Sequence, residues 1–166
     1  MTNAFEITNK NINDFIKSLH DWDLVEIYTD GSCMGNPGPG GWGAVFLNNN
    51  KRSTLSGHEE NTTNNRMELM AAMKSISILP KLINIHVYTD SEYVRNGITV
   101  WIYTWIKNNW RTQDNKPVKN KDLWVPLYDL NEERSINWHW VKGHSNCVNN
   151  ENADFLARSA IINNNK

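Results

Sequence analysis

The alternation of apolar and polar positions along this chain predicts strands first and longer helices later. Segments 24–30, 43–47 and 53–59 are short and rich in β-branched and aromatic residues, as strands are. Residues 63–79 are predicted to form a helix that Pro80 ends, because proline cannot continue a helix. The remaining predicted elements are a strand at 83–90, helices at 91–110 and 121–130, a strand at 136–141 and a helix at 152–162.

The resulting order, βββαβααβα, indicates a fold of the α/β class (α+β mixed). A meander of three strands, followed by two strands that alternate with helices, predicts a mixed sheet covered by helices. With 166 residues and 39% hydrophobic content, the chain has the size and composition of one domain with a buried core. We place this domain at residues 22–166. Residues 1–21 are expected to be a loosely docked N-terminal extension.

The sequence contains no sign of secretion or membrane insertion. Its two cysteines, Cys33 and Cys147, lie in polar, loop-like surroundings that do not suggest a disulfide framework. Residues 1–7 lack the basic region and apolar run of a signal peptide. No apolar stretch approaches the roughly 20 residues that span a bilayer. We therefore expect a soluble cytoplasmic protein with no membrane partner, and we expect it to be a monomer.

The net charge of −1 argues mildly against a nucleic-acid partner, because phosphate contacts usually need a basic surface. The average hides a segregated distribution, since six basic residues stand against one acidic residue between positions 95 and 121. A basic arm on a neutral body is compatible with a duplex-binding protein. The charged residues of this arm are Arg95, Lys107, Arg111, Asp114, Lys116, Lys119 and Lys121.

Two predicted strands end in the same three residues, Tyr-Thr-Asp, at Asp30 and at Asp90. If these strands are parallel neighbours, both carboxylates emerge at the carboxyl edge of the sheet, where ligands bind in open α/β sheets. Carboxylates held together repel, and a cation would relieve that repulsion. The alternative is that each aspartate only caps the next turn or helix, which is the better interpretation for either one alone.

Three further residues acquire meaning only in combination. Glu68 could simply complete a capping box with Asn65 as N-cap. Asp154 could interact with the helix dipole or pair with Arg158. His144 follows the last strand toward the same edge, and an imidazole suits proton transfer near neutral pH. Together with the two aspartates, the carboxylates of Glu68 and Asp154 offer oxygen ligands, which select Mg²⁺ or Mn²⁺ over zinc. Two such ions about 4 Å apart can promote attack on a phosphodiester.

Four segments carry the most specific signal: residues 28–41 (YTDGSCMGNPGPGG), 63–69 (TNNRMEL), 88–91 (YTDS), and 142–144 (KGH) with 150–154 (NENAD). In order and spacing they resemble the motifs of bacterial ribonuclease HI, within the type 1 ribonuclease H family. The resemblance covers about residues 23–162. It implies a ribonuclease H-like fold, with a five-stranded mixed sheet (a three-stranded meander plus two parallel strands) flanked by helices, and a helical basic handle at about 95–124.

The same resemblance implies an endonuclease that hydrolyses the RNA strand of an RNA–DNA hybrid, leaving 5′-phosphate and 3′-hydroxyl products. Two Mg²⁺ ions per active site, with Mn²⁺ as an alternative, would be held by Asp30, Glu68, Asp90 and Asp154, and Asp30 would bridge them. His144 would assist proton transfer or product departure. The positions implied to contact the hybrid are Cys33, Gly35, Asn36, Thr63, Asn64, Asn65, Glu92, Trp101, Trp105 and Trp124.

Within that set the asparagines suit the minor groove, because amides offer donors and acceptors to the 2′-hydroxyl that distinguishes RNA from DNA. Thr63 matches a residue that grips a phosphate of the DNA strand. The handle tryptophans are expected mainly to pack its helices together, with Trp101 and Trp105 on one helix face. Trp124 is expected to touch the DNA backbone as well.

The sequence departs from the family pattern in three places. Glu92 stands where bacterial relatives carry Gln, and a carboxylate cannot donate the hydrogen bond of an amide, although it could accept one from a 2′-hydroxyl. The handle is poor in lysine, with Ile106 and Asn108 among its uncharged residues, which predicts weaker hybrid binding with a shallower salt dependence. Residues 1–21 lack the pattern of the separate hybrid-binding domain of eukaryotic forms.

A binding module without catalysis and a nuclease that acts on DNA are the two alternatives to a ribonuclease H. A catalytically weak nucleic-acid-binding module would lack one of the carboxylates. A DNA-processing nuclease of the same superfamily, such as an integrase or transposase, would lack the handle and the Asn64-Asn65 pair. All of these features are present, so the completeness of the motifs favours the ribonuclease.

Overall fold

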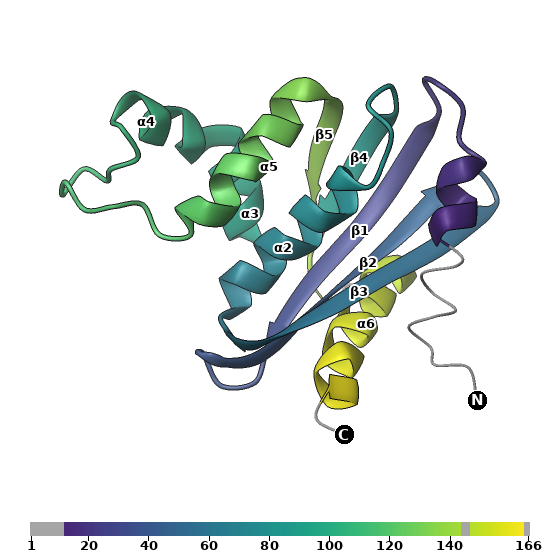
Figure 1. Ribbon diagram of the computed structural model, residues 1–166, viewed down its shortest axis with the longest axis horizontal. Helices are drawn as coiled ribbons and strands as arrows, with labels where there is room; N and C mark the ends of the chain where they lie inside the picture. The colour runs from purple at the N-terminus through teal and green to yellow at the C-terminus, as the bar shows by residue number, and fades with distance from the viewer. Residues whose placement is uncertain (1–11, 144–146, 165–166) are drawn as a thin grey trace.

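The computed structural model describes residues 12–143 and 147–164, which form a single five-stranded sheet with helices on both faces (Figure 1). The strands lie in the order β3-β2-β1-β4-β5. The first three are antiparallel neighbours, whereas β4 pairs parallel with both β1 and β5, so the predicted mixed sheet is confirmed. The strands are β1 (Leu24–Cys33), β2 (Gly38–Asn48), β3 (Lys51–Thr62), β4 (Asn84–Thr89) and β5 (Ser135–Trp140).

Helices cover the two faces of the sheet unequally. α2 packs on β1 and β2 and is joined on that face by α5, while α6 lies across β1, β2 and β3 on the opposite face (Figure 1). A short helical run between β4 and α5 extends away from the sheet and forms the handle. The helical elements are α2 (Asn64–Ser77), α3 (Glu92–Asn96), η1 (Gly97–Trp101), α4 (Ile102–Lys107), α5 (Lys121–Glu133) and α6 (Val148–Asn164).

The alternation of side chains along β1 decides what each face of the sheet carries. Val25 and Ile27 are fully buried, whereas Glu26 and Tyr28 on the other face are only half-buried. Burying an aliphatic side chain of this size stabilises the fold by about 1.5–3 kcal/mol. Asp30 shares the face of Glu26 and Tyr28, so the period of the strand directs its carboxylate to the α6 side of the sheet.

Two glycines allow the helices to approach β1 and β2 closely. A Cβ atom on Gly31 would collide with the backbone of Met67 and Glu68 in α2. A Cβ atom on Gly43 would likewise collide with the Ala153 carbonyl in α6. These contacts press the two helices that carry Glu68 and Asp154 against the strand that carries Asp30.

The handle is held together by a tryptophan cluster, Trp101, Trp105, Trp110 and Trp124. The Trp105 ring lies 5.3 Å from the Trp124 ring and 6.2 Å from the Trp101 ring, measured between centroids. Trp124 is fully buried, and its ring occupies the space that a side chain at position 97 would need, which explains Gly97. The predicted packing role of these rings is confirmed.

The N-terminal extension is docked more firmly than the sequence suggested. Residues 12–17 form a helix whose Ile12 and Phe15 side chains are buried in the main core, and the Phe15 ring lies 6.1 Å from the Phe46 ring of β2. The expectation of a loosely docked extension is therefore wrong for this part. The sequence does predict a short helix at residues 8–20 with Ile12, Phe15, Ile16 and Leu19 on one face, but the partner of this face lies far away in sequence, so the pattern did not show that it docks.

Several element boundaries differ from the prediction because local signals were misread. Thr63, not Asn65, is the N-cap of α2, and its hydroxyl accepts a hydrogen bond from the Arg66 amide at 3.3 Å. Five glycines and two prolines in residues 31–41 predict a turn, but only part of this segment is one, since β1 continues to Cys33 and β2 starts at Gly38. The helix predicted at 91–110 is interrupted by the π-helical η1, and α6 begins at Val148 rather than Asn152. Within the described ranges, we find no helix whose length and hydropathy would let it cross a membrane.

Candidate active site

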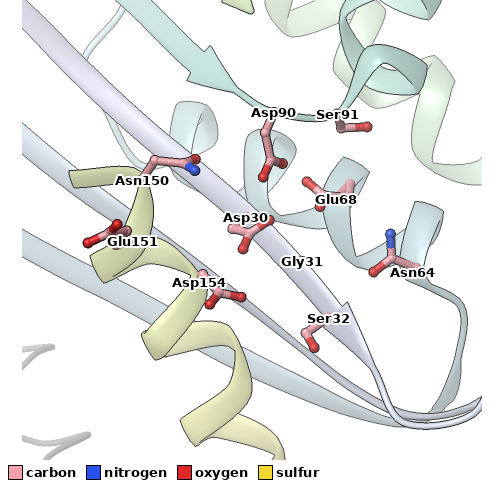
Figure 2. A pocket seen from close by; sticks show the side chains of 10 residues that line it. All are labelled: Asp30, Gly31, Ser32, Asn64, Glu68, Asp90, Ser91, Asn150, Glu151 and Asp154. Atoms are coloured by element: carbon pink, nitrogen blue, oxygen red, sulfur yellow. The ribbon is translucent and has the colours of Figure 1, made fainter. Parts of the chain in front are cut away.

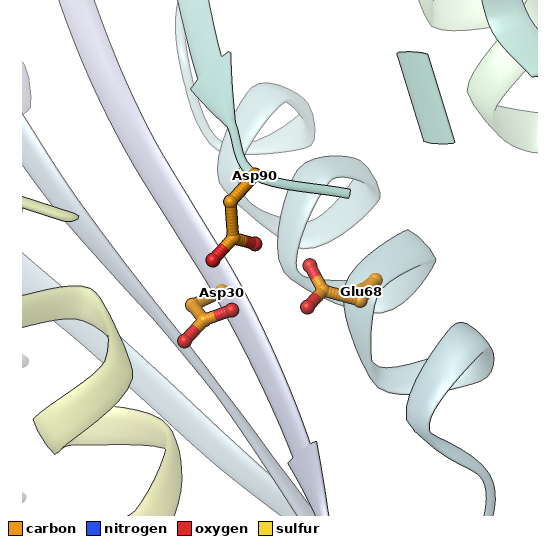
Figure 3. A group of neighbouring side chains, drawn as sticks. All are labelled: Asp30, Glu68 and Asp90. Atoms are coloured by element: carbon orange, nitrogen blue, oxygen red, sulfur yellow. The ribbon is translucent and has the colours of Figure 1, made fainter. Parts of the chain in front are cut away.

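The carboxyl ends of β1 and β4 bring Asp30 and Asp90 together. These two strands pair in parallel register, with Tyr28 opposite Tyr88 and Thr29 opposite Thr89, so the next residue of each strand lies at the same sheet edge. The two carboxylates face each other there (Figure 3). The prediction made from the repeated Tyr-Thr-Asp ending is confirmed.

Glu68 reaches the same point from α2. Carboxylate oxygens of Asp30, Glu68 and Asp90 all lie within 4.8 Å of one another, and we call these three residues the carboxylate triad (Figure 3). Asp30 and Glu68 are buried, at 5% and 4% exposed. Because Thr63 caps the helix, Glu68 has no capping function to perform, and the capping-box interpretation is corrected.

Burial and mutual repulsion disturb the ionisation of the triad. The pKa of Asp30 is raised from 3.8 to about 7, chiefly by burial; a hydrogen bond with Glu68 opposes the rise, and the neighbouring Asp90 and Asp154 carboxylates add to it. Burial also raises the pKa of Glu68 well above its ordinary value, with the Asp30 charge as the next cause. Three acidic groups in this space are therefore costly to ionise together unless a cation compensates them.

The triad fits a hard divalent cation. Among the described residues, Glu68 Oε2 is one of the few buried side-chain oxygens without a hydrogen-bond partner, and a metal ion would satisfy it. All donors in the triad are carboxylate oxygens, which favour Mg²⁺ or Mn²⁺ over metals that prefer nitrogen and sulfur ligands. The chemistry of the site thus agrees with the predicted metal class.

Asp154 borders this site from α6. It lines the same cavity as the triad, and its charge contributes to the raised pKa of Asp30 (Figure 2). Its carboxylate also forms an ion pair with Arg158, at 2.9 Å, one turn further along the helix. Three of the four predicted carboxylates thus converge closely, while the fourth stands beside them and shares its charge with an arginine, as the sequence allowed.

The cavity contains residues to which the sequence assigned no role. Asn150 is 4% exposed, and its Oδ1 atom lacks a hydrogen-bond partner among the described residues. Ser32, Ser91 and Glu151 also line the cavity (Figure 2). Asn150 belongs to the NENAD segment, so the motif pointed to the region, but only the start of α6 at Val148 turns this asparagine toward the triad.

His144 lies outside the described residues. The chain before it does reach the site, because a Cβ atom on Gly143 would stand 3.2 Å from Asp90 Oδ2. The proton-transfer function expected of His144 therefore stays a prediction.

The residues predicted to contact the minor groove of the hybrid lie in the turn between β1 and β2 and at the start of α2. Asn36, in the turn between β1 and β2, accepts a hydrogen bond on Oδ1 from the Asn64 amide at 3.0 Å. Gly35, in the same turn, has a φ of +71°, a conformation that favours glycine. The Cys33 thiol donates to the Gly35 carbonyl at 3.1 Å. This network fixes the turn against the start of α2, where Thr63, Asn64 and Asn65 lie.

The handle residues divide into exposed and buried groups. Glu92 is exposed in the first turn of α3, and Trp101 is 39% exposed. Trp124 has no exposed surface, and its indole N–H donates to the Tyr93 hydroxyl at 3.1 Å. The expectation that Trp124 also touches the DNA backbone is therefore corrected, because its ring is used entirely for packing.

Comparisons with known proteins converge on one family. The family model for RNase H matches residues 23–162. The ribonuclease H of Bradyrhizobium sp. (strain ORS 278) is 54% identical over 143 residues, which cover 86% of this chain and 93% of that relative. The crystal structure of LC9-RNase H1, a type 1 RNase H with the type 2 active-site motif, gives a TM-score of 0.77 at 28% identity and covers 88% of this chain and 75% of that chain. LC11-RNase H1 in complex with an RNA/DNA hybrid shares the fold, with a TM-score of 0.63 at 21% identity, over 86% of this chain and 99% of that chain.

Proposed function

Since the chain belongs to the ribonuclease H family and hydrolyses the RNA strand of RNA–DNA hybrids, we propose that it does so with two divalent ions held by the triad and Asp154. The observation that carries this proposal is the convergence of three carboxylates, two of them buried, at one sheet edge. Mg²⁺ is the expected ion, with Mn²⁺ as an alternative.

When bound, two ions would supply Lewis-acid activation of the attacking water and neutralise charge on the leaving oxygen. The residues of the chain would hold the ions in position. Asp30 would serve both ions, and this proposal is supported by the position of its carboxylate between Glu68 and Asp154 (Figure 2). His144 is proposed to move a proton or assist product departure, giving 5′-phosphate and 3′-hydroxyl ends.

Recognition of the hybrid is proposed to follow the surface beside the triad. Asn36, Asn64 and Asn65, with the backbone near Cys33 and Gly35, would contact the 2′-hydroxyls of the RNA strand in the minor groove. Thr63 keeps its hydroxyl near the surface as the N-cap of α2, and it would hold a DNA phosphate. Glu92, Trp101 and Trp105 are the proposed handle contacts. We further propose a cytoplasmic monomer, which fits the two free cysteines.

The proposal is tested with duplexes whose RNA and DNA strands carry different labels. We expect cleavage of the RNA strand in the hybrid, no cleavage of double-stranded RNA or DNA, loss of cleavage in EDTA and recovery with excess Mg²⁺. Cleavage that persists in EDTA would remove the metal assignment. Cutting of the DNA strand would instead favour a DNA-processing nuclease on the same fold.

A further inference from the structure

A pair of histidines lies on the sheet face that carries Asp30, away from the carboxylate triad. His86 in β4 and His139 in β5 belong to neighbouring parallel strands, with Tyr88 as the direct partner of His139. α6 covers β1, β2 and β3 on this face, and both imidazoles are half-buried rather than enclosed. The pair therefore has access to solvent while being held by the sheet.

The two imidazole rings share a hydrogen bond between one nitrogen of each ring. His86 Nδ1 and His139 Nε2 lie 2.8 Å apart, and the ring planes differ by 9°. The Tyr88 ring stacks on His139 with a centroid distance of 4.6 Å, and Tyr28 stacks on Tyr88 at the same distance. This row of stacked rings packs against His139 and holds its imidazole next to His86.

The charge state of the pair favours an incoming cation. Burial lowers the pKa of His139, and the proximity of His86 lowers it further, so this imidazole is neutral at pH 7 and keeps a lone pair. Glu26 lies directly across from His86 in the parallel register of β1 and β4 and adds a negative charge nearby. A carboxylate beside the His139 lone pair attracts a dication.

We propose that His86 and His139 form a binding site for a transition-metal dication, distinct from the Mg²⁺ site. Two imidazole nitrogens at metal–nitrogen distances of about 2.0–2.1 Å, in adjacent positions around one ion, stand about 2.8–3.3 Å apart, which includes the observed spacing. Binding the ion would require each ring to turn by roughly 45° from this head-on hydrogen bond, so that both lone pairs converge on the metal and replace the hydrogen bond. Water would complete the coordination.

The two sites differ in ligand chemistry, which makes them separable. Imidazole suits Ni²⁺, Cu²⁺ and Zn²⁺, whereas the carboxylate triad suits Mg²⁺ and Mn²⁺. An excess of Mg²⁺ would therefore occupy the triad and leave the histidine pair free for a nitrogen-preferring metal. A metal at this position would join β4 to β5, and it would stabilise the folded protein by an amount that grows with the logarithm of the free metal concentration above the dissociation constant.

The test is isothermal titration of Ni²⁺ into tag-free full-length protein in excess Mg²⁺ at pH 7.5. We expect one equivalent to bind, and we expect His86→Gln and His139→Gln each to weaken binding by about tenfold or more, as loss of half the protein ligands requires. His58→Gln is the matched control, because His58 is exposed on β3 at the far side of the sheet, and it should leave binding unchanged.

Thermal unfolding provides a second readout of the same site. Ni²⁺ should raise the melting temperature of the wild-type protein and of His58→Gln, but not that of the two pair variants. Hybrid cleavage with Mg²⁺ alone should persist in both pair variants, which shows that they fold and separates this proposal from the proposed function. No Ni²⁺ binding, or binding that survives both substitutions, would overturn the proposal and leave the pair as a hydrogen bond between strands.

Discussion

The carboxylate triad at the sheet edge and the tryptophan cluster of the handle both contain buried side chains, but with opposite consequences for stability. In the cluster, apolar rings contact one another, and the one buried polar atom of Trp124 is satisfied by Tyr93. In the triad, acidic groups are buried against one another and Glu68 Oε2 has no partner. The cluster stabilises the fold, whereas the triad costs free energy when its carboxylates are ionised without a cation, which is how functional sites differ from packing sites.

The largest expected effect comes from removing a charge in the triad. Asp30→Asn keeps the shape of the side chain but removes the central negative ligand, so we expect hybrid cleavage to fall by at least about 10³-fold, because metal stabilisation of a transition state amounts to several kcal/mol. Initial rates with a labelled RNA strand measure it. Asp114→Asn in the exposed handle loop is the matched control and should retain activity. Near-normal cleavage by Asp30→Asn would contradict the metal assignment.

Removing a ring from the tryptophan cluster should lower the free energy of unfolding by an amount comparable to the loss of transition-state stabilisation in Asp30→Asn. Trp124→Ala removes a fully buried ring and should lower the free energy of unfolding by about 3–5 kcal/mol, measured by urea denaturation. Trp101→Ala, at a partly exposed position, should cost much less. Equal losses in the two variants would show that burial does not determine the contribution of these rings.

In contrast to the tryptophan cluster, a substitution in the triad should stabilise the folded protein when metal is withheld. Because the pKa of Asp30 is about 7 in the folded protein and 3.8 ordinarily, the folded state binds its proton more tightly, and stability falls as pH rises between these values. In EDTA, Asp30→Asn should therefore be more stable than the wild type by about 1–3 kcal/mol at pH 8, and the difference should vanish near pH 4. Urea denaturation at both pH values measures this, and a pH-independent difference would contradict the assigned cause.

The smallest effects are expected at the exposed charges of the handle. Lys107→Gln and Lys119→Gln should each weaken hybrid binding slightly, and each should reduce the slope of log affinity against log salt by about 0.9 for each lost phosphate contact. Lys17→Gln, in the exposed part of the helix at residues 12–17, should leave the slope unchanged, because this helix lies on the side of the molecule away from the handle (Figure 1). A total wild-type slope as steep as that of a lysine-rich relative would contradict the predicted shallow salt dependence.

The sequence predicted the features that are set by local pattern and by repetition. The repeated Tyr-Thr-Asp ending placed Asp30 and Asp90 at one edge because parallel strands share a carboxyl end. The order of strands and helices predicted a mixed sheet, which is confirmed.

What the sequence did not reveal depends on distant contacts. The apolar helix face with Ile12 and Phe15 can be recognised in the sequence, but its burial depends on Phe46 and its neighbours, which the local pattern does not identify. Trp124 could be a contact or a packing residue until its position against Gly97 was known. The His86–His139 pair requires the offset between β4 and β5, which a single sequence does not specify.

The carboxylates of the triad need a cation in order to be ionised together, and Mg²⁺-dependent thermal unfolding at pH 8 tests this directly. The wild-type melting temperature should rise with Mg²⁺ concentration, because the ion binds the folded protein and relieves the repulsion. The rise should be much smaller in Asp30→Asn and in Glu68→Gln. If both variants gained as much stability from Mg²⁺ as the wild type, the ions would bind elsewhere and the triad would not be a metal site.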